Sequence, residues 1–220
     1  MRPPEIYACI ISQMAIWQGN HMSNPLAKQA LKPGTGEITN GVLNSYFILT
    51  KGPVIMKEID IKDLCKFVNP MLTCEDPAVA IACDGNETNG LTIGWAGFGT
   101  LWRKCTATVY VHKDRYSKHI FDNAAYYSIC YMKPCNKDAV KYFGTVSGRN
   151  EDKMAGCGLT VMNDEAAPYF AESRVAVICR VMGKSDFNAQ SCDEGVREWY
   201  ARDGVHTQYY GEIIKVLVSE

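Results

Sequence analysis

Arg115, Tyr116 and Ser117 form the first group of residues whose types and spacing can do chemistry. An arginine presents a planar fork of N–H donors, and the nearby hydroxyl of Ser117 adds another donor. The segment SKHIFDN predicts a helix that begins at Ser117, and the first backbone amides of a helix can bind an anion. This group predicts a seat for a phosphate, although helix capping explains the same serine.

A second group, TNGLTIGW at residues 88–95, joins small residues to an aromatic one. Glycine lets backbone amides approach a flat ligand closely, and the indole of Trp95 offers that ligand an aromatic face. A hairpin turn with a core tryptophan accounts for the same residues, because Asn-Gly is a common turn signal. Both interpretations stay open on local features.

The third group is the polar, glycine-rich segment GTVSGRNEDK at residues 144–153, which follows an apolar helical pattern. Such a loop can offer Lys153 and backbone N–H groups to an anionic or electron-rich ligand. The order G-x-x-x-x-G-K-S/T is absent, so this is no Walker loop. A solvated surface loop is an equal alternative.

His206 is the one histidine of four that lies in a turn directly before a strand, where a polar ring can face a cleft. His21, His112 and His119 lack comparable surroundings. No H-x-H, H-E-x-x-H or carboxylate-histidine set occurs, so no metal site is predicted. The absence of a G-x-S-x-G elbow argues against a serine or cysteine hydrolase.

Short runs of β-branched and aromatic residues dominate the elements that must position these groups. Many strands with two or three short helices indicate a mainly β protein built on an antiparallel barrel. Helices are predicted within residues 58–68, from Ser117, and over residues 137–144. Strands and turns are predicted between Gly34 and Lys66, a β-meander over residues 78–84, 88–95 and 105–112, and further strands at 126–132, 174–187 (with a turn) and 207–220.

The composition excludes several classes of protein. The chain has 220 residues, of which 47% are hydrophobic and 21% charged, and its formal net charge is -1. No long-range field draws it to nucleic acid or to an anionic membrane. We expect an N-terminal extension over residues 1–36 and one domain over residues 37–220. The apolar run IYACIISQMAIW fits neither a signal peptide nor a membrane span, and Met22 is an alternative start.

Ten cysteines are scattered singly, and none forms a C-x-x-C pair. This spacing argues against a zinc site. Cys83 and Cys179 lie inside apolar runs, where a thiol behaves as a small buried hydrophobe. Reduced core cysteines predict a cytoplasmic protein.

Three patterns together carry a resemblance to a known family. They are T-N-x-x-T-x-x-W at residues 88–95, R-Y-S at 115–117 and S-G-R-x-x-D-K at 147–153, followed by HTQYYGEI at 206–213. In order and approximate spacing, the chain resembles the flavin reductase-like family, particularly its flavoredoxin branch, from about Asn44 to Val218. Two positions differ from the family pattern. Cys105 replaces the proline often seen after W-x-K, and Ser117 stands where threonine is common.

The resemblance implies an antiparallel split β-barrel, with a few short helices, that binds FMN near the interface of a homodimer. It places Asn89, Thr92 and Trp95 along the isoalloxazine, Arg115 and Ser117 at the phosphate or ribityl chain, and the charge of Lys153 near the same flavin. Within the same motifs, the implied cofactor-binding set is completed by Ile93, Gly94, Tyr116 and Ser147. His206 matches a histidine that lies close to the flavin or nicotinamide in many relatives, and it is the one candidate catalytic side chain.

The function implied is an oxidoreductase that passes electrons from a small donor such as NAD(P)H through FMN to an acceptor. No G-x-G-x-x-G loop occurs, so the nicotinamide must stack directly over the flavin. An FMN-binding electron carrier or flavin storage protein shares the same fold and site. A split barrel that binds haem or a deazaflavin is a third possibility.

Overall fold

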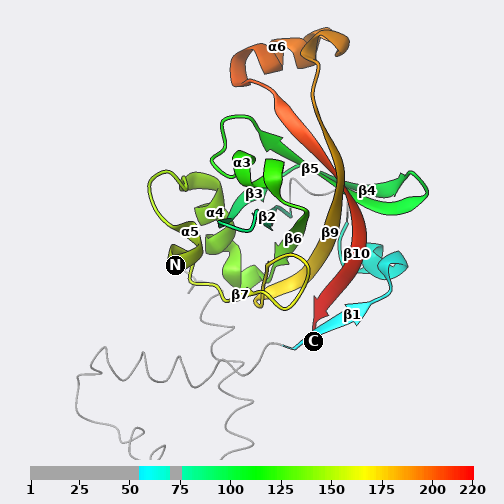
Figure 1. Ribbon diagram of the computed structural model, residues 1–220, viewed down its shortest axis with the longest axis vertical. Coiled ribbons are helices and arrows are strands. Elements are labelled where there is room, and N and C mark those ends of the chain that lie inside the picture. Colours follow the sequence, from blue (N-terminus) through cyan, green and yellow to red (C-terminus); the bar gives the residue numbers. More distant parts are fainter. Residues whose placement is uncertain (1–54, 70–75) are drawn as a thin grey trace, which may run out of the picture. The chain divides into compact units, whose positions relative to one another are not determined.

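An antiparallel sheet of eight strands organises the part of the chain that the computed structural model describes, residues 55–69 and 76–220 (Figure 1). Its strands run in the order β3-β2-β6-β9-β10-β5-β4, and β1 pairs with β10. The path has two ends, β3 and β4, and does not close on itself, which confirms the mainly β, split-barrel prediction. The predicted extension over 1–36, its boundary and the strands predicted before residue 55 lie outside the described residues.

The strands of this sheet are β1 (Met56–Ile59), β2 (Ala78–Cys83), β3 (Thr88–Ile93), β4 (Ala96–Leu101), β5 (Lys104–His112), β6 (Tyr126–Met132), β9 (Ser173–Asp186) and β10 (His206–Ser219). Two short strands, β7 (Val161–Met162) and β8 (Tyr169–Phe170), pair separately.

The central strands bury both of their faces. Along β2, Ala80 and Ala82 pack into one core cluster, while Val79 and Ile81 pack into a second. Because successive side chains of a strand point to opposite faces, two buried faces produce the uninterrupted apolar runs AVAIAC and VAVIC. Cys179, in the second run, is fully buried as the sequence predicts.

β10 connects the two parts of the sheet, since it pairs with β9, β5 and β1. Its register with β9 shifts between Tyr210 and Gly211. A Cβ atom at Gly211 would lie 2.4 Å from the Tyr127 hydroxyl and 2.8 Å from Cys179 Cβ. A glycine is therefore required where β10 crosses these two core side chains.

The helices are short and lie between the strands: η1 (Ile61–Lys66), α3 (Lys118–Asn123), η3 (Pro134–Asn136), α4 (Lys137–Thr145), α5 (Lys153–Gly156), η4 (Ala189–Ser191) and α6 (Glu194–Asp203). The predicted helices near 58–68, after Ser117 and over 137–144 are confirmed as η1, α3 and α4. In residues 55–69 and 76–220, none of the helices is long and apolar enough to cross a membrane.

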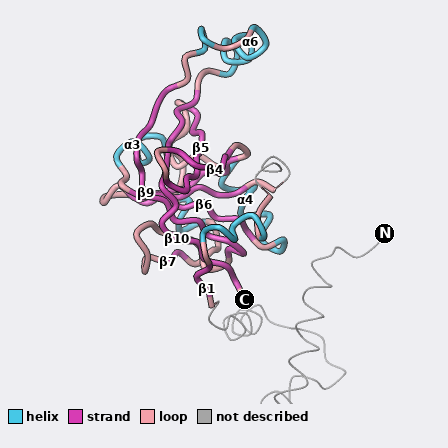
Figure 2. Tube along the Cα trace, turned by 90° about the vertical axis from the view of Figure 1, so that its right-hand side faces the viewer, coloured by secondary structure: helices cyan, strands magenta, loops and turns pink. Residues whose placement is uncertain are grey.

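Helical periodicity does not predict α6, which lies at the end of the long β9–β10 hairpin (Figures 1 and 2). Its apolar residues are sparse, so helical periodicity is weak. Its end signals are present: the Asp193 side chain accepts from the Val196 backbone N–H at 3.1 Å, and Gly204 ends the helix with φ +80°. Start and stop signals would have identified it.

Two further predictions about the strands are wrong. Residues 78–112 form two hairpins, β2–β3 and β4–β5, and not a meander, because β5 pairs with β4 and β10 while β3 pairs with β2. Residues 174–187 contain no turn: β9 continues through Gly183 to Asp186. Its pairing with β10 absorbs the glycine in an irregular register instead.

Candidate functional site

A cavity of about 350 Å³ opens where the C-terminal end of β3, the end of β5 and the start of β10 meet. This volume lies in the range of small-molecule sites. It brings together six of the residues predicted from the sequence and three that were not. The predicted ones are Thr92, Ile93, Gly94, Trp95, Arg115 and His206, and the additional ones are Leu91, Tyr110 and His112.

Strand pairing explains how the distant His206 reaches the others. β10 runs antiparallel to β5 with His206 opposite His112, and their ring centroids are 5.0 Å apart. Tyr110 follows the same face of β5 as His112, because side chains two residues apart share a face. That alternation was the available signal for Tyr110 and His112.

Arg115 lies in the loop between β5 and α3. Its Nη1 donates to the Gly144 carbonyl at the end of α4, at 3.0 Å. Within the described residues this is the only hydrogen bond of the guanidinium, so other donors of its fork remain available to a ligand. Among the described residues, none of those that line this cavity is a carboxylate, whereas Arg115, His112 and His206 do line it. Its electrostatics suit an anionic group.

Thr92 connects the cavity to α4. Its hydroxyl donates to the Val140 carbonyl. A Cβ atom at Gly144 would stand 3.4 Å from Thr92, so helix and strand pack closely. The Thr92 hydroxyl is thus engaged inside the protein, and the strand can offer a ligand its backbone.

His206 is held among rings. Its centroid lies 4.6 Å from that of Trp95 and 5.8 Å from that of Trp199, and its Nδ1 is buried with no hydrogen-bond partner among the described residues. Burial first, then the charges of His112 and Arg115, lower the pKa of His206 to about 4. The imidazole is therefore neutral at pH 7.

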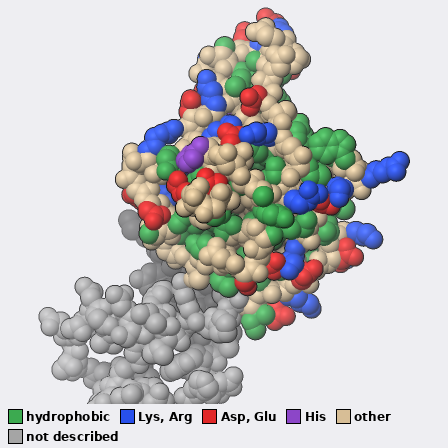
Figure 3. All heavy atoms as spheres, viewed as in Figure 1, with side chains coloured by type: hydrophobic (Ala, Val, Ile, Leu, Met, Phe, Trp, Pro, Cys, Tyr) green, Lys and Arg blue, Asp and Glu red, His purple; other side chains and the backbone are tan. Residues whose placement is uncertain are grey.

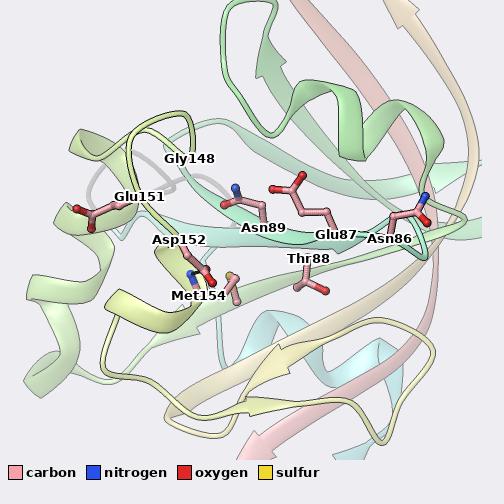
Figure 4. Close-up of a pocket in the computed structure, with 8 residues that line it drawn as sticks. All are labelled: Asn86, Glu87, Thr88, Asn89, Gly148, Glu151, Asp152 and Met154. Atoms are coloured by element: carbon pink, nitrogen blue, oxygen red, sulfur yellow. Dashed lines mark hydrogen bonds between the residues drawn. The ribbon is translucent and has the colours of Figure 1, made fainter.

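Asn89 lies at a different cavity, of about 470 Å³, around the N-terminal half of β3 (Figure 4). Figure 4 shows Asn89 on this strand and Glu87 directly before it, with Glu151 and Asp152 on the facing segment. The Asn89 amide oxygen accepts from the Gly90 N–H at 2.7 Å. Three carboxylates around this cavity disfavour an anionic ligand.

Ser117 and Lys153 both donate to one backbone oxygen instead of lining the cavity. The Lys153 Nζ lies 2.6 Å and the Ser117 Oγ 3.3 Å from the Gly90 carbonyl oxygen. Lys153 also donates to the Phe143 carbonyl at 3.4 Å. Burial, and secondarily the charge of Arg115, lower the pKa of Lys153 to about 8. The two hydrogen bonds to the Gly90 carbonyl connect β3 to the N-terminal ends of α3 and α5.

Tyr116 and Ser147 also lie outside the cavity. The Tyr116 hydroxyl donates to Glu87 at 3.1 Å, and the Ser147 hydroxyl accepts from the Arg149 backbone N–H at 3.3 Å. A Cβ atom at Gly148 would come within 2.3 Å of the Tyr116 ring and 2.5 Å of the Asn89 amide. The glycine in S-G-R lets this loop close over Tyr116.

The sequence profile of the flavin reductase like domain matches residues 71–220, well over half of the chain. The protein therefore belongs to the flavin reductase-like family, as the resemblance indicates, and it carries a flavin-binding domain of the oxidoreductase type. A search of curated proteins finds no match.

Solved structures similar to the chain include two flavoredoxins. That of Methanosarcina acetivorans is 21% identical, with 64% of this chain and 67% of that chain covered and a TM-score of 0.52. That of Desulfovibrio vulgaris (Miyazaki F) is 22% identical, with coverage of 66% and 69% and a TM-score of 0.51. The NADH:FAD oxidoreductase SgcE6 of Streptomyces globisporus C-1027 is 13% identical, with coverage of 86% and 91% and a TM-score of 0.52. At these identities the likeness establishes the fold.

Proposed function

We propose that the chain binds FMN in the cavity at the end of β3 and passes electrons from a small donor, such as NAD(P)H, through the flavin to an acceptor. One observation carries the proposal: backbone, aromatic rings and an arginine with available donors converge on a cavity whose described lining residues include no carboxylate. An anionic group attached to a flat ring system is the kind of ligand that this lining fits.

The residues divide into two roles. Arg115 binds the phosphate, while the backbone of Thr92, Ile93 and Gly94 and the indole of Trp95 face the isoalloxazine. Five other residues act from outside the cavity by holding β3 and its neighbouring loops in place: Asn89, Tyr116, Ser117, Ser147 and Lys153.

Bound FMN supplies the redox chemistry, accepting two electrons from the donor and releasing them to the acceptor. The side chains bind and orient. His206 is neutral, so it can exchange hydrogen bonds with flavin or nicotinamide without placing a second full charge beside Arg115.

We further propose that the chain is a homodimer with β4 in its interface. Among the described strands β4 pairs with β5 alone, and residues 95–102, WAGFGTLW, contain neither charge nor proline. Native proteins protect such edges. Trp102 is 61% exposed at the tip of this hairpin, and Figure 3 shows hydrophobic side chains gathered where Figure 1 draws β4.

Light scattering of the purified full-length chain tests the dimer. We expect twice the mass of one chain, and Trp102→Lys should shift the mass toward the monomer. A monomeric wild-type chain at micromolar concentration contradicts this part of the proposal and leaves flavin binding untouched.

The visible spectrum before and after anaerobic addition of NADH or NADPH tests the redox function. A yellow protein that bleaches supports the reductase. Yellow colour that persists with both nucleotides supports the carrier or storage alternative, and a protein that takes up no added FMN overturns both. Arg115→Ala serves as the matched variant, because it removes the phosphate contact while the fold remains.

A further inference from the structure

An aromatic cluster joins α6 to the wall of the cavity. From the cavity side come Trp95, Tyr110 and His206, and from the hairpin arm come Phe187, Trp199 and Tyr200. Trp199 lies at the centre of these contacts: its ring centroid is 5.1 Å from that of Trp95 and 5.0 Å from that of Tyr200. α6 thus brings to the site a residue that the family motifs do not include.

The rings enclose His206 from several sides. The Trp199 plane is within 17° of the imidazole plane, and Trp95 packs at 35°. His112 meets the imidazole edge-on at 83°. Because these planes fix the tilt of the imidazole, they also fix the directions in which its two nitrogens point.

The backbone anchors Trp199 as well. The His112 Nδ1 accepts from the Asp114 backbone N–H at 3.1 Å, so its Nε2 carries the proton and donates to the Asp203 carbonyl at the end of α6. At the following Gly204, a Cβ atom would lie 2.9 Å from Lys113 Cε and 3.2 Å from His112 Nε2. α6 is therefore attached to β5 beside the cavity.

We propose that Trp199 is a positioning residue for the cavity: by stacking on His206 and packing on Trp95, it fixes both rings of the cavity wall and excludes water from the inner side of the imidazole. The effect of Trp199 on FMN binding rests on the proposed flavin function, whereas its effect on His206 does not. The Nδ1 atom of His206 is itself buried, and its burial among these rings is the independent observation behind this role.

The charged and titratable groups that face His206 are His112 from β5, Arg115 from the adjoining loop and Asp203 from α6. His112 and Arg115 lower the pKa of His206 and Asp203 raises it, while burial is the largest cause of its low value. Loss of the Trp199 ring removes burial and leaves these three groups in place. The pKa must then move toward 6.5, the ordinary value for histidine.

The test is an NMR titration of His206 in the full-length, flavin-free chain, with the resonance assigned by its loss in His206→Gln. We expect a pKa of about 4 in the wild type, above about 5 in Trp199→Ala, and near the wild-type value in Trp199→Phe, which keeps a ring. Phe67→Ala is the control, because it removes a 41% exposed aromatic ring directly after η1 and should leave the pKa of His206 unchanged. An unchanged pKa in Trp199→Ala overturns the inference.

FMN affinity at pH 8, where His206 is neutral in every variant, gives the second readout. We expect a loss of about tenfold for Trp199→Ala and of less than twofold for Trp199→Phe, in line with one lost ring contact. A raised pKa with unchanged FMN affinity overturns the positioning role. Failure of every variant to bind FMN contradicts the proposed function, and the titration still decides this inference. If Trp199→Ala does not fold, Trp199→Gln replaces it.

Discussion

The two cavities along β3 differ in charge although they share one strand. At the C-terminal end, the described lining residues include Arg115 and two histidines but no carboxylate, whereas three carboxylates surround the N-terminal half. An anionic ligand therefore has one favourable place along this strand. The difference shows that a single motif, T-N-x-x-T-x-x-W, supplies residues to two sites of opposite character.

Strand geometry explains the division. Asn89 and Thr92 are three residues apart, and side chains at odd spacing lie on opposite faces of a strand. Between them the Gly90 carbonyl receives both Ser117 and Lys153. These two hydrogen bonds hold β3 at its middle, between the cavity proposed to bind flavin and the cavity lined by carboxylates.

The largest expected effect comes from Arg115→Ala. Removing a charged donor from the proposed phosphate site should weaken FMN binding about 10- to 150-fold, since a hydrogen bond to a charged group contributes about 1.5–3 kcal/mol. Fluorescence titration measures it, with riboflavin as the ligand that lacks the phosphate. Arg149→Ala is the control, because its guanidinium donates to the Asp114 carbonyl and not to the cavity. Equal losses for FMN and riboflavin contradict the phosphate role.

Lys153→Met distinguishes two roles of Lys153: holding β3 through the Gly90 carbonyl, and direct contact with the flavin. The pKa of Lys153 is about 8 in the folded chain and about 10.5 when unfolded. Between these values the unfolded state binds more protons, so the free energy of unfolding rises with pH from 8 to 10. We expect this rise, on the order of 2 kcal/mol, to disappear in urea denaturation of the variant.

FMN binding at pH 7 completes the same experiment. If Lys153 acts through the Gly90 carbonyl, the dissociation constant of Lys153→Met changes by less than about threefold, the effect of a small shift of β3. A tenfold loss would instead restore the direct contact that the family resemblance implies.

His206 gives a smaller effect in the acid range. Its pKa is about 4 in the folded chain and about 6.5 when unfolded. The unfolded state binds the extra proton in this window, so stability falls as pH drops from 6.5 toward 4. We expect about 1 kcal/mol of this loss to vanish in His206→Gln. Parallel denaturation curves for variant and wild type at pH 4.5 and 7 would contradict a neutral, shielded imidazole.

The smallest effect is expected at the acidic cavity. Glu87→Gln and Asp152→Asn remove charge with little change of shape, and asparagine keeps the cap that Asp152 provides for α5. FMN affinity should change by less than about twofold, since these groups lie away from the proposed phosphate site. A gain in FMN affinity above fivefold shows that the flavin reaches this cavity, which contradicts the proposed difference between the two cavities.

The sequence predicts most elements of the described fold but not the order of the strands. Runs such as AVAIAC and YYSICYM predict β2 and β6 because their composition is local information. That β5 pairs with β10, almost a hundred residues later, depends on long-range packing that no local pattern encodes. The periodicity of the strands predicts only an antiparallel barrel, whereas the family resemblance implies the split form of that barrel.

The candidate site divides in the same way. Thr92, Trp95, Arg115 and His206 meet in one cavity because the motif positions already reflect the fold. Lys153 has the right type for a flavin contact, but it is buried and donates to two backbone carbonyls. Such competition between protein and ligand partners is visible only in three dimensions.

The central place of β10 has a consequence for biosynthesis. A nascent chain that still lacks residues 206–219 has the strands β3-β2-β6-β9 on one side and β5-β4 on the other, without the strand that joins them. The cavity cannot form on the ribosome before this segment emerges, and the unpaired edges of β9 and β5 stay open to wrong partners meanwhile. Transient protection by chaperones would matter most between the synthesis of β9 and that of β10.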